Sequence, residues 1–131
     1  MEQLVASPRV FVIVLDDDPA VRNSLKFSLE IEGFIVHAHA TPADLLNDTD
    51  LERCKCLIVD QNMPDIKGLD LVQILRQRHI NAPAILITSH PSVALSRNAA
   101  NAGVPIVEKP LLGNALLDKI NDAIALHPAL R

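Results

Sequence analysis

The strongest constraint on the fold is an unbroken apolar run, Val10–Leu15, followed by three consecutive aspartates, Asp16–Asp18. A short, β-branched run of this kind is typical of a strand buried on both faces of a parallel sheet. In such sheets, ligands bind at the carboxyl ends of the strands. Three adjacent carboxylates repel one another, and a hard divalent cation with oxygen ligands is their usual compensator. The run therefore predicts a parallel α/β sheet with a metal site at a strand end.

Strand and helix patterns alternate along the rest of the chain. Further strands are predicted at four apolar segments: Phe34–Ala38, Cys56–Val59, Ala84–Thr88 and Val104–Val107. Five helices are expected. The first opens with Asp18 and Pro19 and ends at Gly33, and the second begins at Thr41. The third and fourth are Gly68–Arg78 and Pro91–Ala102, and the fifth carries Leu112, Leu116, Ile120 and Ile124 and closes near His127–Pro128. Because crossover connections are right-handed, this order predicts a doubly wound five-stranded parallel sheet with helices on both faces.

Composition narrows the class of function. The 131 residues suit one domain, 1–131, with its core at about 10–126. Aromatic residues make up 2%, without Trp or Tyr, which disfavours stacking on a base or flavin ring. A net charge of −4 gives no electrostatic footprint for direct nucleic-acid binding. Neither a membrane-length apolar segment nor a signal-peptide pattern occurs, so a cytoplasmic location and no membrane contact are expected. The pair Cys54 and Cys56 predicts two reduced thiols, because zinc sites need more ligands.

Polar side chains follow four of the predicted strands. They are Asp16, Asp17 and Asp18, then Asp60 and Asn62, then Thr88, and finally Glu108 and Lys109. A carboxylate nucleophile, a cation site, a hydroxyl and an ammonium together suit phosphoryl transfer to a carboxylate. Taken singly, Asp18 reads as a helix cap, and Thr88 and Lys109 as ordinary loop residues. Their joint occurrence at the strand ends favours the functional interpretation.

Four segments resemble the receiver domain of two-component response regulators: Leu15–Asp18, Ile58–Gly68, Ile85–Ser89 and Glu108–Pro110. The resemblance covers about Val10 to Leu126. It implies a flavodoxin-like fold with strand order 2-1-3-4-5. It also implies phosphorelay signalling rather than turnover of an external substrate.

The resemblance implies a Mg²⁺ site around the phosphoacceptor, Asp60. Asp17 would ligate Mg²⁺ directly and Asp16 mainly through water. The backbone carbonyl of Asn62 would complete the protein ligands. Thr88 and Lys109 would contact the phosphoryl group.

The implied partner is a sensor histidine kinase or phosphotransfer protein that donates a phosphoryl group from phosphohistidine. Phosphorylation would draw Thr88 inward and bias the face formed by the fourth helix, fifth strand and fifth helix, through which a homodimer is also possible. The resemblance further implies a cis peptide between Lys109 and Pro110.

The sequence departs from the family pattern near the fifth strand. Ile106 occupies the switch position three residues before Lys109, where Tyr or Phe is usual. Segment 103–109 is also one residue shorter than usual. We therefore expect weakened or rerouted coupling to output.

Three other readings compete with a working receiver. A flavodoxin-like cofactor binder is disfavoured by the aspartates and the missing aromatics. A Mg²⁺-dependent phosphohydrolase usually carries a second aspartate where Asn62 stands. A degenerate receiver that only binds partners is disfavoured because Asp17, Asp60, Thr88 and Lys109 are all present. No output motif follows the last helix, so a stand-alone receiver and part of a longer regulator or hybrid kinase are both open.

Overall fold

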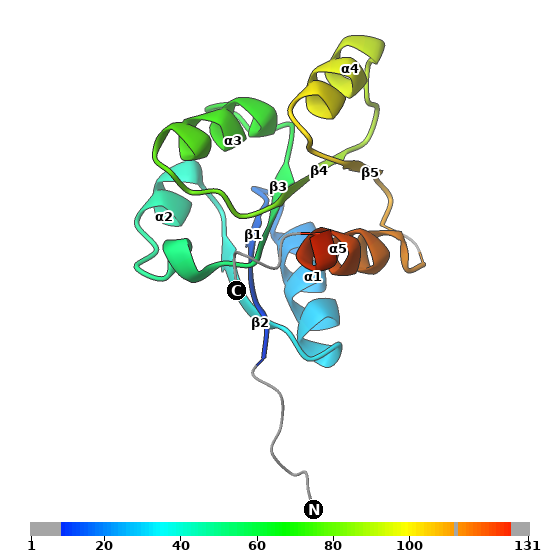
Figure 1. Ribbon diagram of the computed structural model, residues 1–131. Helices are drawn as coiled ribbons and strands as arrows, with labels where there is room; N and C mark the ends of the chain where they lie inside the picture. Colours follow the sequence, from blue (N-terminus) through cyan, green and yellow to red (C-terminus); the bar gives the residue numbers. More distant parts are fainter. Residues whose placement is uncertain (1–8, 112, 127–131) are drawn as a thin grey trace, which may run out of the picture.

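The computed structural model describes residues 9–111 and 113–126 as a sheet flanked by helices (Figure 1). The sheet has five parallel strands in the order β2-β1-β3-β4-β5. The strands are β1 (Phe11–Leu15), β2 (Ile35–His39), β3 (Cys56–Asp60), β4 (Ala84–Thr88) and β5 (Ile106–Glu108). The helices are α1 (Pro19–Ile31), α2 (Pro42–Leu46), α3 (Gly68–Gln77), α4 (Val93–Asn101) and α5 (Ala115–Leu126), with a 3₁₀ turn at Leu51–Arg53. This topology confirms the predicted flavodoxin-like fold.

Two apolar clusters hold the helices to opposite faces of the sheet. One face packs against α1 and α5, and the other against α2, α3 and α4 (Figure 1). Side chains of a strand alternate between the faces. Ile13 and Leu15 of β1 therefore join the second group of helices, whereas Val12 and Val14 join the first. The continuous apolar runs reflect strands that are buried on both sides.

The helix starts form as the sequence predicts. Asp18 caps α1 by accepting a 2.9 Å hydrogen bond from the Ala20 amide, with Pro19 in the first turn. Thr41 caps α2 because its Oγ1 accepts a 3.1 Å hydrogen bond from the Asp44 amide. Each cap satisfies one of the amides that a helix start leaves unpaired.

The first three strands differ from the predicted ranges by one residue at one or both ends. The first begins at Phe11 and not at Val10. Phe34 precedes β2 because its amide bonds to the Leu29 carbonyl at the end of α1. At the other end, His39 pairs with Leu15 and extends the strand. Likewise β3 includes Asp60, which pairs with Ile87.

The predicted fourth helix, Pro91–Ala102, is two residues too long at its start and one at its end. The predicted fifth strand, Val104–Val107, begins two residues too early and ends one residue too early. Ser92 lies outside α4 as its cap and accepts 3.0 Å from the Leu95 amide. Val104 is buried but not in β5, because its amide bonds to the Ala99 carbonyl and completes the end of α4. Val104 was predicted as a strand residue because it is apolar and β-branched, but its side chain is buried at the end of a helix and not in a strand.

The third and fifth helices also differ slightly from prediction. Arg78 lies just beyond α3 as its C-terminal cap. The described part of α5 begins at Ala115, after Gly113 with a positive φ of 67°. The predicted helix residue Leu112 and the closing pair His127–Pro128 lie outside the described residues.

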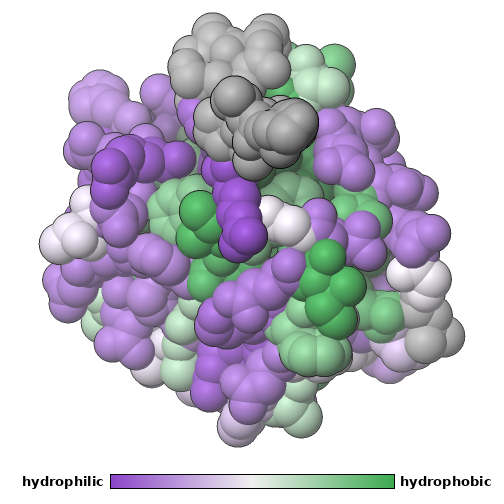
Figure 2. All heavy atoms as spheres, turned by 90° about the horizontal axis from the view of Figure 1, so that it is seen from below, coloured by the Kyte–Doolittle hydropathy of each residue, from purple (hydrophilic) through white to green (hydrophobic). Residues whose placement is uncertain are grey.

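The surface fits a fold with its apolar residues inside. On the face seen from below, hydrophilic residues surround smaller groups of hydrophobic ones (Figure 2). Within the described ranges, no helix has the length and apolarity needed to cross a bilayer.

Candidate functional site

Sheet register brings the predicted site residues to one edge of the sheet. Asp16 directly follows Leu15, which pairs with Val59, so Asp16 and Asp60 end neighbouring strands. On the next strand, Thr88 pairs with Glu108, the residue before Lys109. The amide of Lys109 donates a 2.8 Å hydrogen bond to the Thr88 carbonyl.

Three aspartates form an acidic cluster here, defined as Asp16, Asp17 and Asp60. One carboxylate oxygen from each lies within 4.8 Å of the others. Asp16 is 0% exposed and Asp60 3%, whereas Asp17 is exposed to solvent. The cluster is thus a largely buried carboxylate pair with one accessible carboxylate.

Backbone contacts orient Asp16. Its Oδ1 accepts a 2.9 Å hydrogen bond from the Asp18 amide, and Arg22 Nη1 donates 2.9 Å to its carbonyl oxygen. Oδ2 is buried, and its 3.3 Å contact with Lys109 Nζ is an ion pair without hydrogen-bond geometry, so no described residue donates a well-aligned hydrogen bond to it. A buried carboxylate oxygen without a donor carries a large desolvation cost. Mg²⁺ prefers oxygen ligands, and this oxygen, with Asp17 and Asp60, fits that ion.

Lys109 lies between the two buried carboxylates. Its Nζ is 3.3 Å from Asp16 Oδ2 and 3.3 Å from Asp60 Oδ1. Burial alone would lower the pKa of the ammonium, but the charges of Asp16 and Asp60 outweigh it and raise that pKa. Lys109 is therefore a permanent cation at neutral pH.

The electrostatics of Asp60 oppose its ionisation. Burial raises the pKa of its carboxyl, and the charge of Asp16 raises it further. Lys109 and the Asn62 amide, which lies 3.3 Å from Asp60 Oδ1, act in the opposite direction without cancelling that rise. One ammonium is thus too little positive charge for the cluster, and an added cation would stabilise it.

Thr88 and Asn62 form a polar contact beside the cluster. Thr88 is 1% exposed, and its Oγ1 accepts a 3.1 Å hydrogen bond from Asn62 Nδ2. The Thr88 hydroxyl retains its own hydrogen for donation. The side chain of Asn62 therefore points to Thr88, while its backbone stays next to Asp60.

Comparison with known proteins assigns this arrangement to a family. The profile of the response regulator receiver domain matches residues 12–121. The chain belongs to the response regulator receiver family. It is therefore a signalling domain of two-component systems, as the sequence motifs predict.

Relatives with similar sequences support the same family assignment. FixJ, a transcriptional regulatory protein of Rhizobium meliloti, is 35% identical over 113 residues, which cover 86% of this chain and 55% of FixJ. The response regulator protein TodT of Pseudomonas putida is 35% identical over 127 residues, 95% of this chain and 56% of TodT. The receiver thus spans about half the length of these relatives.

Solved receiver structures superpose over nearly the whole chain. The crystal structure of FixJ-N has a TM-score of 0.76 at 30% identity and covers 92% of this chain and 97% of its own. A CheY-like receiver from Methanospirillum hungatei has a TM-score of 0.82 at 26% identity and covers 93% and 98%. The cis peptide that the family resemblance implies, Lys109–Pro110, is present.

Two residues that support the receiver site escaped the sequence analysis as functional positions. Gln61 Oε1 accepts a 2.8 Å hydrogen bond from the Leu69 amide and so caps the start of α3. A Cβ atom at Gly68 would lie 2.5 Å from the carbonyl oxygen of Asp60, so only glycine fits. In the sequence, the glycine at the start of the predicted third helix, Gly68, was the one sign that the backbone packs closely here.

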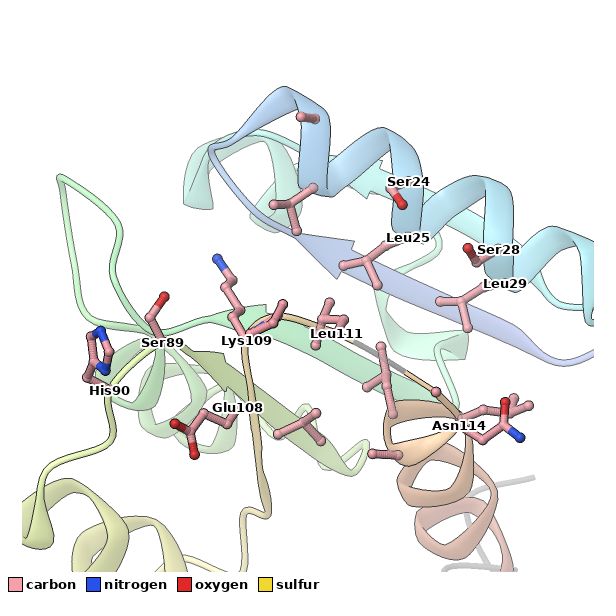
Figure 3. A pocket seen from close by; sticks show the side chains of 18 residues that line it. Ser24, Leu25, Ser28, Leu29, Ser89, His90, Glu108, Lys109, Leu111 and Asn114 are labelled. Atoms are coloured by element: carbon pink, nitrogen blue, oxygen red, sulfur yellow. The ribbon is translucent and has the colours of Figure 1, made fainter.

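A cavity adjoins the site on the other side of Lys109. It has a volume of about 800 Å³ and lies between α1 and the segment from β5 to α5. Leu25 and Leu29 of α1 point across it toward Leu111 (Figure 3). Lys109 and Ser89 are among the described residues that line this cavity, whereas Asp16, Asp17 and Asp60 are not. The cavity is therefore separate from the carboxylates.

Proposed function

We propose that the receiver takes a phosphoryl group onto Asp60 from the phosphohistidine of a sensor histidine kinase or phosphotransfer protein. The observation that carries this proposal is the position of Lys109 Nζ, 3.3 Å from both Asp16 and Asp60 at the sheet edge. That position brings together a nucleophilic carboxylate, a second buried carboxylate and the one ammonium that they share. Family membership supports the same function.

The acidic cluster is the proposed holder of Mg²⁺. Asp17 and Asp60 would bind the ion directly, Asp16 mainly through water, and the backbone carbonyl of Asn62 would be the remaining protein ligand. When bound, Mg²⁺ supplies positive charge against the phosphoryl oxygens. The buried Oδ2 of Asp16 supports this assignment, because it shares the Lys109 ammonium with Asp60 and lacks a well-aligned hydrogen bond.

The transfer breaks the P–N bond of phosphohistidine and forms a P–O bond to the Asp60 carboxylate. The imidazole leaves with the electron pair of the broken bond, and no oxidant or reductant is needed. Lys109 is free to follow the charge from the carboxylate to a phosphoryl oxygen, since it approaches Asp60 as a point charge. Thr88 offers its hydroxyl hydrogen to another phosphoryl oxygen.

The same site would later assist hydrolysis of the acyl phosphate by water. The receiver therefore catalyses its own phosphorylation and dephosphorylation and turns over no external substrate. His90, two residues after Thr88, is exposed and lines the same cavity as Lys109, so it lies close enough to the proposed site to orient water.

The proposed output surface is the face formed by α4, β5 and α5. Phosphorylation biases this face through Thr88, and a partner or a second receiver would read the change. Ile106 lies half-buried beside a depression of about 360 Å³, which small residues such as Ala99, Ala100 and Gly103 line. The aliphatic side chain at position 106 lines this depression and lacks a ring that could extend into it, which supports weakened coupling.

The test is intact-mass spectrometry after brief incubation with Mg²⁺ and acetyl phosphate. We expect one phosphoryl adduct that is absent in Asp60→Asn and absent when EDTA replaces Mg²⁺. Lack of an adduct, together with lack of beryllofluoride binding by NMR, would contradict the proposal and favour a partner-binding module. Multiple turnover of acetyl phosphate without a labelled intermediate would instead indicate a phosphohydrolase.

A further inference from the structure

A second cluster of potential metal ligands lies on the edge strand of the sheet. His37 and His39 are two residues apart in β2 and so project from the same face of the strand. His37 Nδ1 and His39 Nε2 each lie 2.8 Å from one oxygen, Oδ2 of Asp48. The three side chains come from the sheet edge and the segment after α2, and their ligand atoms converge on one point.

The surroundings hold this cluster in place. Asp48 Oδ1 accepts a 2.8 Å hydrogen bond from the Asp50 amide, and the Asp48 amide donates 3.1 Å to the carbonyl of Leu45. The ring of Phe11 meets the ring of His37 edge-on at 4.4 Å between centroids. Such supporting contacts are what fix the orientation of metal ligands in proteins.

Exposure of the cluster suits an open coordination site. The Asp48 side chain is 5% exposed, whereas those of His39 and His37 are 20% and 37% exposed. Burial alone raises the pKa of the Asp48 carboxyl, but hydrogen bonds from His39, the Asp50 amide and His37 lower it to about 2. The carboxylate is therefore ionised, and water reaches the imidazole side of the cluster.

We propose that His37, His39 and Asp48 bind a divalent transition-metal ion, with Zn²⁺ as the best-matched probe. Two imidazoles and one carboxylate, with solvent at the remaining position, are a common donor set for Zn²⁺. Bond lengths of about 2.0–2.2 Å in tetrahedral geometry put ligand atoms about 3.3 Å apart. The two nitrogen-to-carboxylate separations of 2.8 Å need to open by about half an ångström, and the two imidazole nitrogens lie within 4.8 Å of each other.

Binding needs only a rearrangement of protons. Each imidazole nitrogen that faces Asp48 must present a lone pair, so its hydrogen moves to the other ring nitrogen or leaves to solvent. The ion then replaces the hydrogens that now separate the rings from the carboxylate. No redox step is involved.

This site is distinct from the acidic cluster in chemistry. The acidic cluster has only oxygen donors and suits Mg²⁺, whereas imidazole nitrogen favours transition metals. The two sites are nevertheless close, because the Asp16 amide donates a 3.1 Å hydrogen bond to the His39 carbonyl. A test must therefore keep the acidic cluster filled with Mg²⁺.

The test is calorimetric titration of the full chain with Zn²⁺ in excess Mg²⁺. We expect one Zn²⁺ per chain, and an affinity that falls about tenfold or more in His39→Asn and in His37→Gln. His79→Asn and His90→Gln are the matched controls, since both residues are exposed and remote from Asp48 in sequence, and they should leave the affinity unchanged. Co²⁺ in place of Zn²⁺ should give visible d–d absorption that His39→Asn removes.

Two results would overturn the proposal. One is equal Zn²⁺ affinity in the parent chain, His39→Asn and His37→Gln. The other is loss of Zn²⁺ binding in Asp17→Asn, which would place the ion in the acidic cluster. Circular dichroism and thermal unfolding show that each variant is folded. His37→Gln changes the more exposed of the two histidines, so it is the variant less liable to disturb the fold.

Discussion

Nδ2 of Asn62 donates a 3.1 Å hydrogen bond to Oγ1 of Thr88, across the ends of β3 and β4. This bond holds the Thr88 hydroxyl in the unphosphorylated receiver. In the proposed mechanism the same hydroxyl must reach a phosphoryl oxygen. If reaching that oxygen moves Thr88 away from Asn62, the proposed mechanism implies that this bond opposes the phosphorylated state.

We expect Asn62→Ala to bind beryllofluoride more tightly than the parent chain. A net hydrogen bond of about 0.5–1.5 kcal/mol corresponds to a gain of roughly 2- to 10-fold. The substitution keeps the backbone carbonyl that is the proposed Mg²⁺ ligand. Fluorine NMR titration measures the affinity, with the exposed Asn81→Ala as control. An unchanged affinity in Asn62→Ala would show that this bond does not restrain Thr88.

Asp60→Asn should stabilise the receiver at neutral pH without Mg²⁺. Because the pKa of Asp60 is raised in the folded state, ionisation costs stability. That loss begins as pH rises above 3.8, the ordinary value, and is complete once pH has passed the folded pKa. The amide removes the charge, so we expect a higher free energy of unfolding at pH 7 than in the parent chain. The gain should vanish well below pH 3.8, the ordinary value, where the carboxyl is protonated in both states.

Urea unfolding at pH 7 and at low pH in EDTA measures this difference. Asp70→Asn, an exposed acid on α3, is the control and should show little change. A destabilised Asp60→Asn at pH 7 would mean that the ion pair with Lys109 outweighs burial and repulsion by Asp16.

Gly68→Ala should damage the site through the backbone. The added Cβ would lie 2.5 Å from the Asp60 carbonyl oxygen, so the start of α3 must move. Overpacking of this kind costs about 1–3 kcal/mol. Thermal unfolding measures the loss, and Asp70→Ala on the same helix should show no comparable effect. Full stability in Gly68→Ala would mean that α3 shifts freely.

The two thiols should be unreactive in the folded receiver. Burial raises the pKa of Cys54 to about 12 and that of Cys56 further. Thiolate is the reacting form, so at pH 8 labelling by a disulfide reagent should follow unfolding. We expect both thiols to react at once in denaturant and only slowly without it. Rapid labelling of the native protein would contradict their burial.

Ile106→Phe should strengthen the response of the output face. A ring at this position would occupy the depression beside α4 and alternate with Thr88. Beryllofluoride should then produce larger NMR shifts across α4 and β5 than in the parent chain. Ile35→Phe, on the exposed edge strand, serves as the matched control. Parent-chain shifts as large as those of Ile106→Phe would refute weakened coupling.

The sequence predicted the sheet because its signals are local and strong. Runs such as Val10–Leu15 and Ala84–Thr88 are apolar throughout, and strand ends are where polar residues reappear. The caps Asp18 and Thr41 formed as predicted because capping depends on residues two or three positions away.

Contacts between distant segments were beyond sequence reasoning. Val104 resembled a strand residue because it is buried, but its backbone belongs to the end of α4. The bond between Asn62 and Thr88 spans 26 residues, and the approach of His39 to Asp48 joins an edge strand to a loop. No local pattern encodes either contact.

The short backbone bond from the Lys109 amide to the Thr88 carbonyl limits how the receiver can respond. It fixes the separation of β4 and β5 at the point where both proposed phosphoryl contacts leave the sheet. Thr88 must therefore move by rotation about its own side-chain torsion rather than by sliding of a strand. Because Thr88 is 1% exposed, this rotation requires its packed surroundings to move, so the rate of signalling should be set by the slower rearrangement of the helices around the site.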